Sequence, residues 1–280
     1  MGALMFKHVV VGVRDVETGP DAIALAGQLT SRGGSVTLVH VREVADRPAA
    51  DSGAARSAHL RRFWIERLAT LAEACSINAS AACVEARSSR HGLHEFAASS
   101  RTDLLVIGAT ARDEIERDLV RDDARRVLEG APCAVAVAPR GYRPGRATLA
   151  RIGVAYDGSP ESRRALALGR ALAAEHDAEV AAFEVVSAPL YAHDSCEMHE
   201  EIDRSVTRAR ERLAALGGVD AEAGFGHHVD ELAHFAESVD LLILGGHRYT
   251  LPDRLLERST AQLLADSTPS PLLVLSASPE

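Results

Sequence analysis

The segment GGHRYTLPDRLLERST, residues 245–260, combines residue types that bind phosphate groups. It begins with two glycines directly after an apolar run and ends with the adjacent hydroxyls of Ser259 and Thr260. Glycine lets backbone N–H groups approach a phosphate, and a hydroxyl either caps the following helix or donates a hydrogen bond to a phosphate oxygen. A turn glycine followed by an ordinary helix cap explains the same residues without any ligand, so both interpretations stay open.

Two arginines, Arg248 and Arg258, stand in this segment where close backbone approach usually requires glycine. A side chain at a left-handed backbone position costs about 1–2 kcal/mol, and an arginine there also competes with a phosphate for space. A guanidinium group, however, binds phosphate through two hydrogen bonds and can replace lost N–H contacts, and His247 adds a further donor. Alternatively, the arginines pair with Asp253 and Glu257 at the surface, where such pairs contribute little to stability.

A second group of ligand-type residues lies in HDSCEMH, residues 193–199. Its His193, Cys196 and His199 are chemically reasonable zinc ligands. Six residues of regular helix span about 9 Å, so the three side chains reach one ion only if the segment is irregular. A polar loop leading into a helix predicted at 200–217 is the favoured interpretation, and no metal site is assigned.

These segments are positioned by a pattern of strands and helices that occurs twice. HVVVGV at 8–13 corresponds to RIGVAYDGS at 151–159, and TDLLVIGA at 102–109 corresponds to VDLLILGG at 239–246. Continuous apolar strands that alternate with helices of three or four turns predict βαβ units, and therefore parallel sheets with helices on both faces. In such sheets, ligands bind where the loops after the strands converge with helix N-termini.

The region between the two halves contains prolines, glycines and arginines without periodicity, which is typical of a linker. A length of 280 residues also favours two domains, since a domain has roughly 150 residues. We therefore predict a first domain at 1–142, a linker at 143–149 and a second domain at 150–280.

Composition limits the classes of partner. The net charge of −9 and the pI near 5.7 argue against nucleic acid or an anionic membrane. No run approaches the about 20 apolar residues of a membrane span, and the start MGALMFKHVVVGV does not read as a secretory leader. The four cysteines show no paired spacing. These features predict a soluble cytoplasmic protein.

Several motifs, recurring in order in both halves, make the chain resemble the universal stress protein family. They are YDGSPESRRAL at 156–166, LLILGGHRYTLPDRLLERST at 241–260 and APCAVAVAP at 131–139. Nucleotide-binding members of that family carry an aspartate after the first strand and Gly-x2-Gly-x9-Gly-Ser/Thr after the fourth. The resemblance implies two tandem Rossmann-like domains of the adenine nucleotide alpha hydrolase-like type. Each would be a mostly parallel five-stranded α/β sheet with helices on both faces.

In the second half, the resemblance implies a site for ATP or a related adenine nucleotide. Asp157 matches the family aspartate that contacts the adenosine moiety, and Val185 stands where a backbone group meets the adenine. Gly245 matches the first motif glycine, whereas arginines replace the other two. Ser259 keeps the hydroxyl. The predicted nucleotide-binding residues are Asp157, Val185, Gly245, His247, Arg248, Arg258, Ser259 and Thr260.

The first half departs further from the family motif. Gly108 keeps the first glycine, but Arg14 replaces the aspartate and Ala111 the second glycine. Arg121 and Asp122 replace the terminal Gly-Ser/Thr pair, and the Asp122 carboxylate would repel a phosphate. We therefore predict no ATP site in the first half.

The favoured function is a stress-response regulatory protein that binds an adenine nucleotide in its second domain and is non-catalytic, or hydrolyses ATP slowly at most. One alternative is a scaffold that binds no nucleotide, and another is a metal-binding protein that uses residues 193–199. The resemblance further implies that the fifth strands, CAVAVAP at 133–139 and PLLVLSA at 271–277, pair within the chain. It is also compatible with a homodimer.

Overall fold

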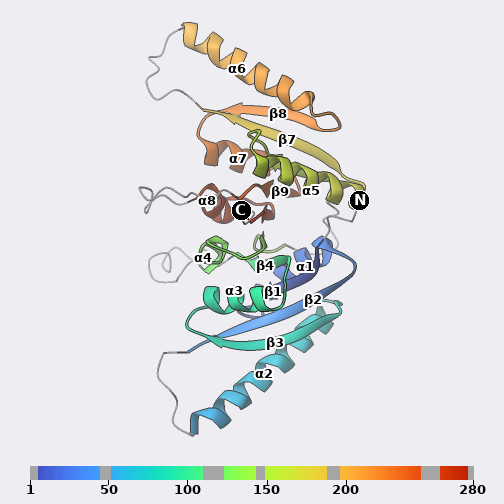
Figure 1. The fold of residues 1–280 in the computed structure, drawn as a ribbon, viewed down its shortest axis with the longest axis vertical. Helices are drawn as coiled ribbons and strands as arrows, with labels where there is room; N and C mark the ends of the chain where they lie inside the picture. The colour runs from blue at the N-terminus through green and yellow to red at the C-terminus, as the bar shows by residue number, and fades with distance from the viewer. Residues whose placement is uncertain are drawn as a thin grey trace. The chain divides into compact units, whose positions relative to one another are not determined.

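The structure is a computed structural model that describes residues 6–44, 52–109, 123–142, 149–187, 196–246 and 259–276. The chain divides into two compact units, Met5–Arg146 and Ala147–Glu280. Each unit is a Rossmann-like α/β fold, and the colour gradient of Figure 1 passes from the first unit to the second as green turns to yellow. The domain and linker boundaries expected from the sequence stay a prediction.

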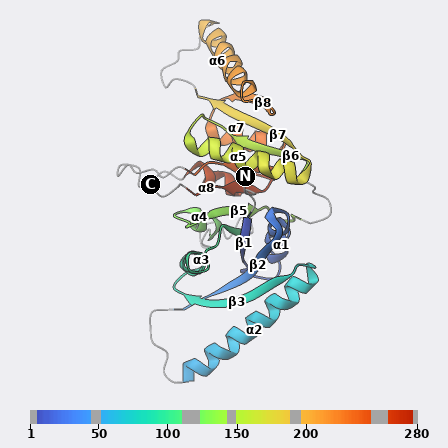
Figure 2. The ribbon, with the colours of Figure 1, turned by 45° about the vertical axis from the view of Figure 1, so that its right-hand side comes forward.

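The first unit contains a parallel sheet in the order β3-β2-β1-β4-β5. Helices α1 and α2 cover one face of this sheet, and α3 and α4 cover the other (Figure 2). Its described elements are β1 (Phe6–Gly12), α1 (Gly19–Leu29), β2 (Thr30–Glu43), α2 (Ser52–Ala74), β3 (Ala79–Ala86), α3 (Ser89–Ser99), β4 (Leu104–Gly108), α4 (Asp123–Leu128) and β5 (Ala134–Ala138).

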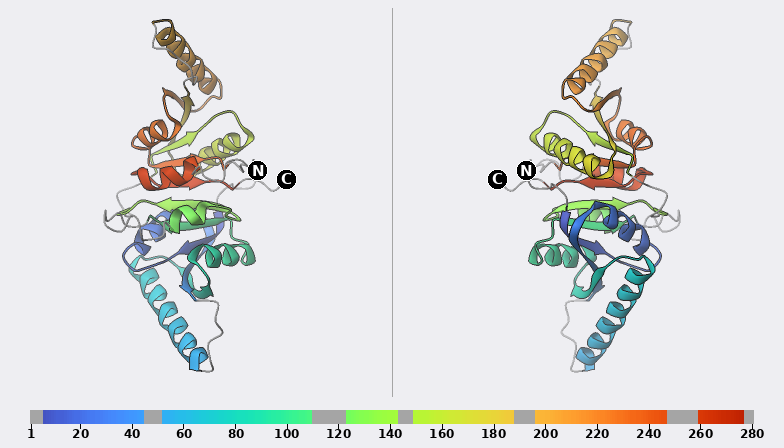
Figure 3. Two further views of the ribbon diagram at one scale, coloured as in Figure 1. Left: turned by 90° about the vertical axis from the view of Figure 1, so that its left-hand side faces the viewer. Right: turned by 90° about the vertical axis from the view of Figure 1, so that its right-hand side faces the viewer.

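The second unit repeats this topology with the order β10-β9-β6-β7-β8, again with parallel pairs. Helix α5 lies on one face of the sheet, and α7 and α8 lie on the other (Figure 3). Its described elements are β6 (Arg151–Ala155), α5 (Pro160–His176), β7 (Glu179–Val186), α6 (Cys196–Ala214), β8 (Asp220–Phe225), α7 (His228–Ala236), β9 (Leu241–Leu244), α8 (Thr260–Ser267) and β10 (Leu272–Val274). None of the described helices has the length and apolar character of a membrane span.

The continuous apolar strands predicted from the sequence form the centre of each core. Leu104, Leu105 and Val106 of β4 are fully buried, as are Leu241 and Leu242 of β9. A strand covered by helices on both faces has no solvated side, so its residues are apolar without alternation. Burial of these central strands therefore accounts for the pattern by which the sequence predicts the sheet.

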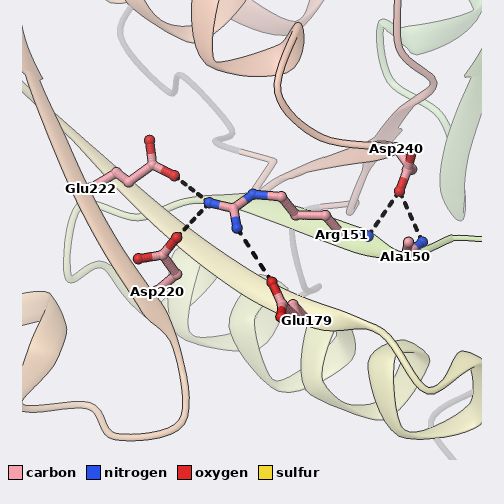
Figure 4. A network of polar contacts seen from close by, with 6 residues as sticks. All are labelled: Ala150, Arg151, Glu179, Asp220, Glu222 and Asp240. Carbon is pink, nitrogen blue, oxygen red and sulfur yellow. Dashed lines mark hydrogen bonds and ion pairs between the residues drawn. The ribbon is translucent and has the colours of Figure 1, made fainter.

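One carboxylate in each unit joins the amino-terminal ends of two central strands. Asp240, just before β9, accepts hydrogen bonds at 2.8 Å from the backbone nitrogens of Ala150 and Arg151 (Figure 4). Asp103, just before β4, accepts bonds of 2.7 Å and 3.0 Å from the backbone nitrogens of Lys7 and His8. The pairing of these strands is thus fixed by the same side-chain contact in both copies.

The side chain of Arg151 extends this contact across the second sheet. Its guanidinium lies 2.5 Å from carboxylate oxygens of Asp220 and Glu222 and 3.5 Å from Glu179, so it connects β6, β7 and β8 (Figure 4). The hydrogen bond to Asp220 is the largest influence that raises the pKa of Arg151. In the first unit, His8 occupies this position and its Nδ1 lies 3.2 Å from the Ser35 hydroxyl.

Removing the Asp240 carboxylate tests how much this contact stabilises the second unit. We expect Asp240→Ala to lower the free energy of unfolding by about 1–3 kcal/mol, because two backbone donors lose their partner. Urea unfolding monitored by circular dichroism measures the change. Asp203→Ala, at an exposed position of α6, is the matched control and should change stability by less than about 0.5 kcal/mol. Equal effects of the two substitutions would contradict this role.

Candidate functional site

The carboxyl ends of the central strands form the site region in each unit. From β6 the chain crosses to β7 on one side, and β9 pairs with β6 on the other. A crevice opens where the connections leave a parallel sheet in opposite directions. In the first unit, this point lies between β1 and β4.

Strand register brings three of the predicted residues to the crevice of the second unit. Ala155 pairs with Phe183, so Asp157, two residues further on, is level with Val185 of β7. Val154 pairs with Ile243, so Gly245 lies just beyond β9 on the other side of β6. Positions far apart in the sequence therefore meet at one edge of the sheet.

Asp157 shapes the turn between β6 and α5. Its Oδ1 accepts a hydrogen bond of 2.9 Å from the backbone nitrogen of Ser159, and Gly158 between them has φ of +79°. The Ser159 hydroxyl in turn accepts a 3.1 Å bond from the backbone nitrogen of Ser162, so Ser159 caps α5 as the sequence predicts. The exposed Asp157 carboxylate is therefore held at the N-terminus of α5.

Gly245 is required by packing. A Cβ at this position would lie 2.8 Å from the backbone carbon of Glu161 and 2.8 Å from its Cβ, in the first turn of α5. The equivalent Gly108 approaches the carbonyl oxygen of Thr18, at 3.1 Å from a built Cβ. The first motif glycine therefore has a structural role in both units, independent of any ligand.

Ser259 forms a complete capping box at the start of α8. Its hydroxyl accepts a 3.2 Å bond from the backbone nitrogen of Gln262, whose Oε1 accepts a 3.0 Å bond from the backbone nitrogen of Ser259. The spacing Ser-x-x-Gln is the sequence signal for this motif. A hydroxyl that accepts one bond can still donate its proton, so the cap leaves a role toward a phosphate open. Thr260 is the first residue of α8.

Three predicted site residues, His247, Arg248 and Arg258, lie outside the described residues, as does His193 of the candidate metal group. Cys196 begins α6, but its side chain is not described, and His199 is exposed on that helix. Among the described side chains, no group of three His, Cys, Asp or Glu residues is arranged to hold a metal ion.

The first unit contains a cavity of about 170 Å³ at the equivalent crevice. Its inner wall includes the buried side chains of Val13, Val39, Leu93 and Val127, which come from separate elements. The sequence identifies two of its lining residues, Arg14 and Gly108, as motif positions of the first half. The other lining residues come from separate elements, and no local motif predicts that they meet.

A tight turn forms the rim of this cavity after β1. Oδ1 of Asp15 accepts hydrogen bonds from the backbone nitrogens of Glu17 and Thr18, at 3.0 Å and 2.8 Å, and from the Thr18 hydroxyl at 2.9 Å. Partial burial is the largest single influence on the pKa of Asp15 and raises it, but these hydrogen bonds together lower the pKa below its usual value. Asp15 therefore does for this turn what Asp157 does in the second unit.

The buried side chain of His40 contacts the backbone just before this turn. Its Nδ1 lies 2.9 Å from the carbonyl oxygen of Val13, and its ring stacks on Trp64 of α2 with centroids 3.5 Å apart. Because a carbonyl only accepts, Nδ1 must carry the proton. Burial is the largest influence on the pKa of His40 and lowers it, while the bond to Val13 partly opposes the shift.

Comparison with known proteins decides the family. The sequence model of the Universal stress protein family matches residues 5–139 and 148–276. The chain belongs to the universal stress protein family. It contains two copies of the family domain, as the resemblance predicted.

Solved structures share this tandem fold. A universal stress protein from Archaeoglobus fulgidus DSM 4304 has 14% sequence identity and a TM-score of 0.69, with 96% of each chain covered. A functionally unknown protein from Pseudomonas aeruginosa PAO1 has 16% identity and a TM-score of 0.63, with 97% of this chain and 92% of that chain covered. No curated protein matches the chain. At these identities, the structures show that the fold is shared.

Substitution of Gly245 in this universal stress protein tests the packing constraint. We expect Gly245→Ala to destabilise the second unit by about 1–3 kcal/mol, because the methyl group overlaps the backbone of Glu161. Gly27→Ala, at an exposed position of α1, is the control, since nothing lies within 4 Å of a Cβ built there. That substitution should stabilise the protein by about 0.5–1 kcal/mol. Thermal unfolding of both variants measures the two effects, and a neutral Gly245→Ala would contradict the close approach.

The single tryptophan, Trp64, provides a direct measurement of His40 protonation. Because a charged imidazole quenches a stacked indole, fluorescence should titrate with a midpoint below the usual His value of about 6.5. The folded pKa is lower than the unfolded pKa, so the contribution of His40 to stability is complete above about pH 6.5 and is lost as pH falls through the folded pKa.

Two variants identify the residue responsible for this titration. His40→Gln should abolish the fluorescence change, whereas His94→Gln, at a histidine bonded to the Val127 carbonyl, should leave the midpoint unchanged. A midpoint above about 6.5 in the native protein would contradict a buried neutral His40.

Proposed function

We propose that this universal stress protein binds ATP or a related adenine nucleotide in its second unit. The observation that carries the proposal is the convergence of Asp157, Val185 and Gly245 around the carboxyl end of β6. The family resemblance assigns the adenosine contact to the first two and the first glycine of the phosphate motif to the third. Strand register supports this assignment because it brings all three to one crevice.

The local geometry gives each residue a means of contact. The paired residues of β6 and β7 end at Ala155 and Phe183. Val185 lies two residues further along β7, so its backbone groups are outside the pairing of these two strands. The exposed Asp157 carboxylate is oriented by Ser159 and can accept hydrogen bonds from ribose hydroxyls. Helix α8 begins with the Ser259 hydroxyl and its backbone N–H groups, which attract negative charge.

This set of residues suits binding rather than bond breaking. Among the described residues assigned to the site, the polar side chains of Asp157 and Ser259 are a carboxylate and a helix-capping hydroxyl, groups that can hold a ligand in place. A regulatory role follows if the nucleotide favours one arrangement of residues 245–260 over another, since a ligand shifts a population only through such a difference. Slow hydrolysis of ATP is compatible with this role but is not needed for it.

A scaffold without nucleotide is the second candidate function. The packing of Gly245 on Glu161 and the capping box of Ser259 favour it, because both explain motif residues by folding alone. In a scaffold, the retained motif would stabilise the loop and the helix start and contact no ligand. The pairing of the two fifth strands and a homodimer, both expected from the family resemblance, stay predictions for either function.

Ligand titration distinguishes the two functions. We expect ATP to raise the thermal midpoint of the native protein, since a ligand at 100 times its dissociation constant stabilises the folded state by about 2.7 kcal/mol. Asp157→Ala should abolish this shift, whereas Asp203→Ala, at an exposed position of α6, should preserve it. AMP and cyclic nucleotides in the same assay define the ligand. Absence of any shift or calorimetric binding at millimolar nucleotide, with an intact fold, would favour the scaffold.

A further inference from the structure

We propose that the outer edge of β3 in the first unit binds an extended peptide segment of another protein, whose side chains alternate between acidic and apolar. The segment would add a strand to the sheet and lie in a groove between α2 and α3. This groove has a volume of about 880 Å³. It is separate from the nucleotide crevice proposed for the second unit, and neither proposal depends on the other.

The groove lies across the edge of the sheet rather than over one of its faces. Val84 and Glu85 of β3 both line it. Consecutive residues of a strand point to opposite faces, so a groove that touches both side chains lies at the edge of the strand. Its other lining residues come from α2, between positions 57 and 65, and from α3, between positions 92 and 99. These helices lie on either side of β3 (Figures 1 and 2).

The outer edge of β3 directs backbone groups into this groove. Among the described strands, β3 pairs with β2 alone. The carbonyl oxygen of Ala86 accepts a 2.9 Å hydrogen bond from the backbone nitrogen of Val44, so the backbone groups of Ala86 face β2. Because this direction alternates along a strand, the N–H and C=O of Glu85 face the outer edge. Such an edge is a template for pairing with another chain.

The composition of β3 does not protect its edge from such pairing. Edge strands commonly carry charged side chains that oppose the addition of another strand. In the eight residues of β3, Glu85 alone is charged, and its carboxylate is bound by Arg42 and the Ser57 hydroxyl. The outer strand of the second sheet, β8, carries Asp220 and Glu222 in six residues. The outer edge of the first sheet is therefore the better template.

The two walls of the groove favour different side chains. Arg61 and Arg62 are exposed on the α2 wall and attract acidic groups. On the α3 wall, Phe96 offers an apolar contact, and the exposed Glu95 repels a carboxylate. In an added strand, successive side chains point to the two walls in turn. A segment with acidic residues toward α2 and apolar residues toward α3 therefore fits both walls.

Helical walls on both sides favour a single extended chain over the edge of a second sheet. A second copy that presented its own β3 would bring its own α2 and α3 against these walls. An extended peptide has no such layers. It gains affinity from main-chain hydrogen bonds with the edge and selectivity from its alternate side chains.

A capped hexapeptide of alternating glutamate and valine tests the proposal. With the full-length protein, fluorescence anisotropy of the labelled peptide should give a dissociation constant about tenfold lower than for the same peptide with lysine in place of glutamate. Hydrogen exchange at the Glu85 amide should slow when the glutamate peptide binds. Equal binding of the two peptides, or no binding at millimolar concentration, would overturn the proposal.

Methylation of the peptide backbone tests strand addition itself. In an added strand, the N–H groups of one residue type face β3 and those of the other face away. Methylation of the valine nitrogens and methylation of the glutamate nitrogens should therefore change the dissociation constant by amounts that differ about tenfold. Equal effects of the two methylated peptides would overturn the proposal.

Variants locate the groove. Arg62→Gln should weaken the glutamate peptide about tenfold, while Arg67→Gln removes a charge from the same helix outside the groove and should have no effect. Ala58→Trp, at an exposed position in the groove, should abolish binding. Circular dichroism verifies that each variant is folded. Unchanged affinity in folded Arg62→Gln and Ala58→Trp would overturn the proposal. So would a dimer of the native protein that Ala58→Trp dissociates, since a second copy would then occupy the groove.

Discussion

The position of β1 and β6 at the centre of their sheets is the constraint on which the crevice of each unit depends. Crossovers between parallel strands are right-handed, so connections to strands on opposite sides of a central strand lie on opposite faces of the sheet. The chain therefore leaves the carboxyl ends of neighbouring strands in divergent directions and opens a crevice there. Asp103 and Asp240 fix this arrangement from the other end, since each bonds to the backbone of the central strand.

The two units keep the contacts that folding requires and differ in the side chains at the crevice. Asp157 at the second crevice is replaced by Arg14 at the first. There the carboxylate of the next residue, Asp15, accepts the backbone hydrogen bonds of the turn. On the strands next to the central ones, β2 and β7, the register makes His40 equivalent to Glu184. His40 stacks on Trp64 of α2, whereas Glu184 pairs with Arg212 of α6. The same strand–helix contact is thus made by aromatic stacking in one unit and by an ion pair in the other.

The fold could be predicted from the sequence because its signals are local and repeated. Continuous apolar runs such as LLVIG and LLIL mark strands buried on both faces, and Ser159 followed by Pro160 marks the start of a helix. The place of Asp157, Val185 and Gly245 at one crevice follows from strand order, which the family resemblance supplies. The sequence could not show whether Gly245 is needed for packing or for a ligand, because its contact with Glu161 depends on how α5 packs against β9. At the first crevice the sequence indicates Arg14 and Gly108 but not the rest of the lining, because Val39, Leu93 and Val127 meet only in the folded chain.

The central claim is that a duplicated α/β unit retained adenosine-binding chemistry in its second copy alone. Hydrogen exchange measured by mass spectrometry, with and without saturating ATP, tests this claim most directly because it reports on each segment of the full chain. The account predicts increased protection at the start of α5, at residues 243–246 and at the start of α8, with no change at the equivalent positions after β1 and β4. Protection confined to the first unit, or none in either unit, would contradict it.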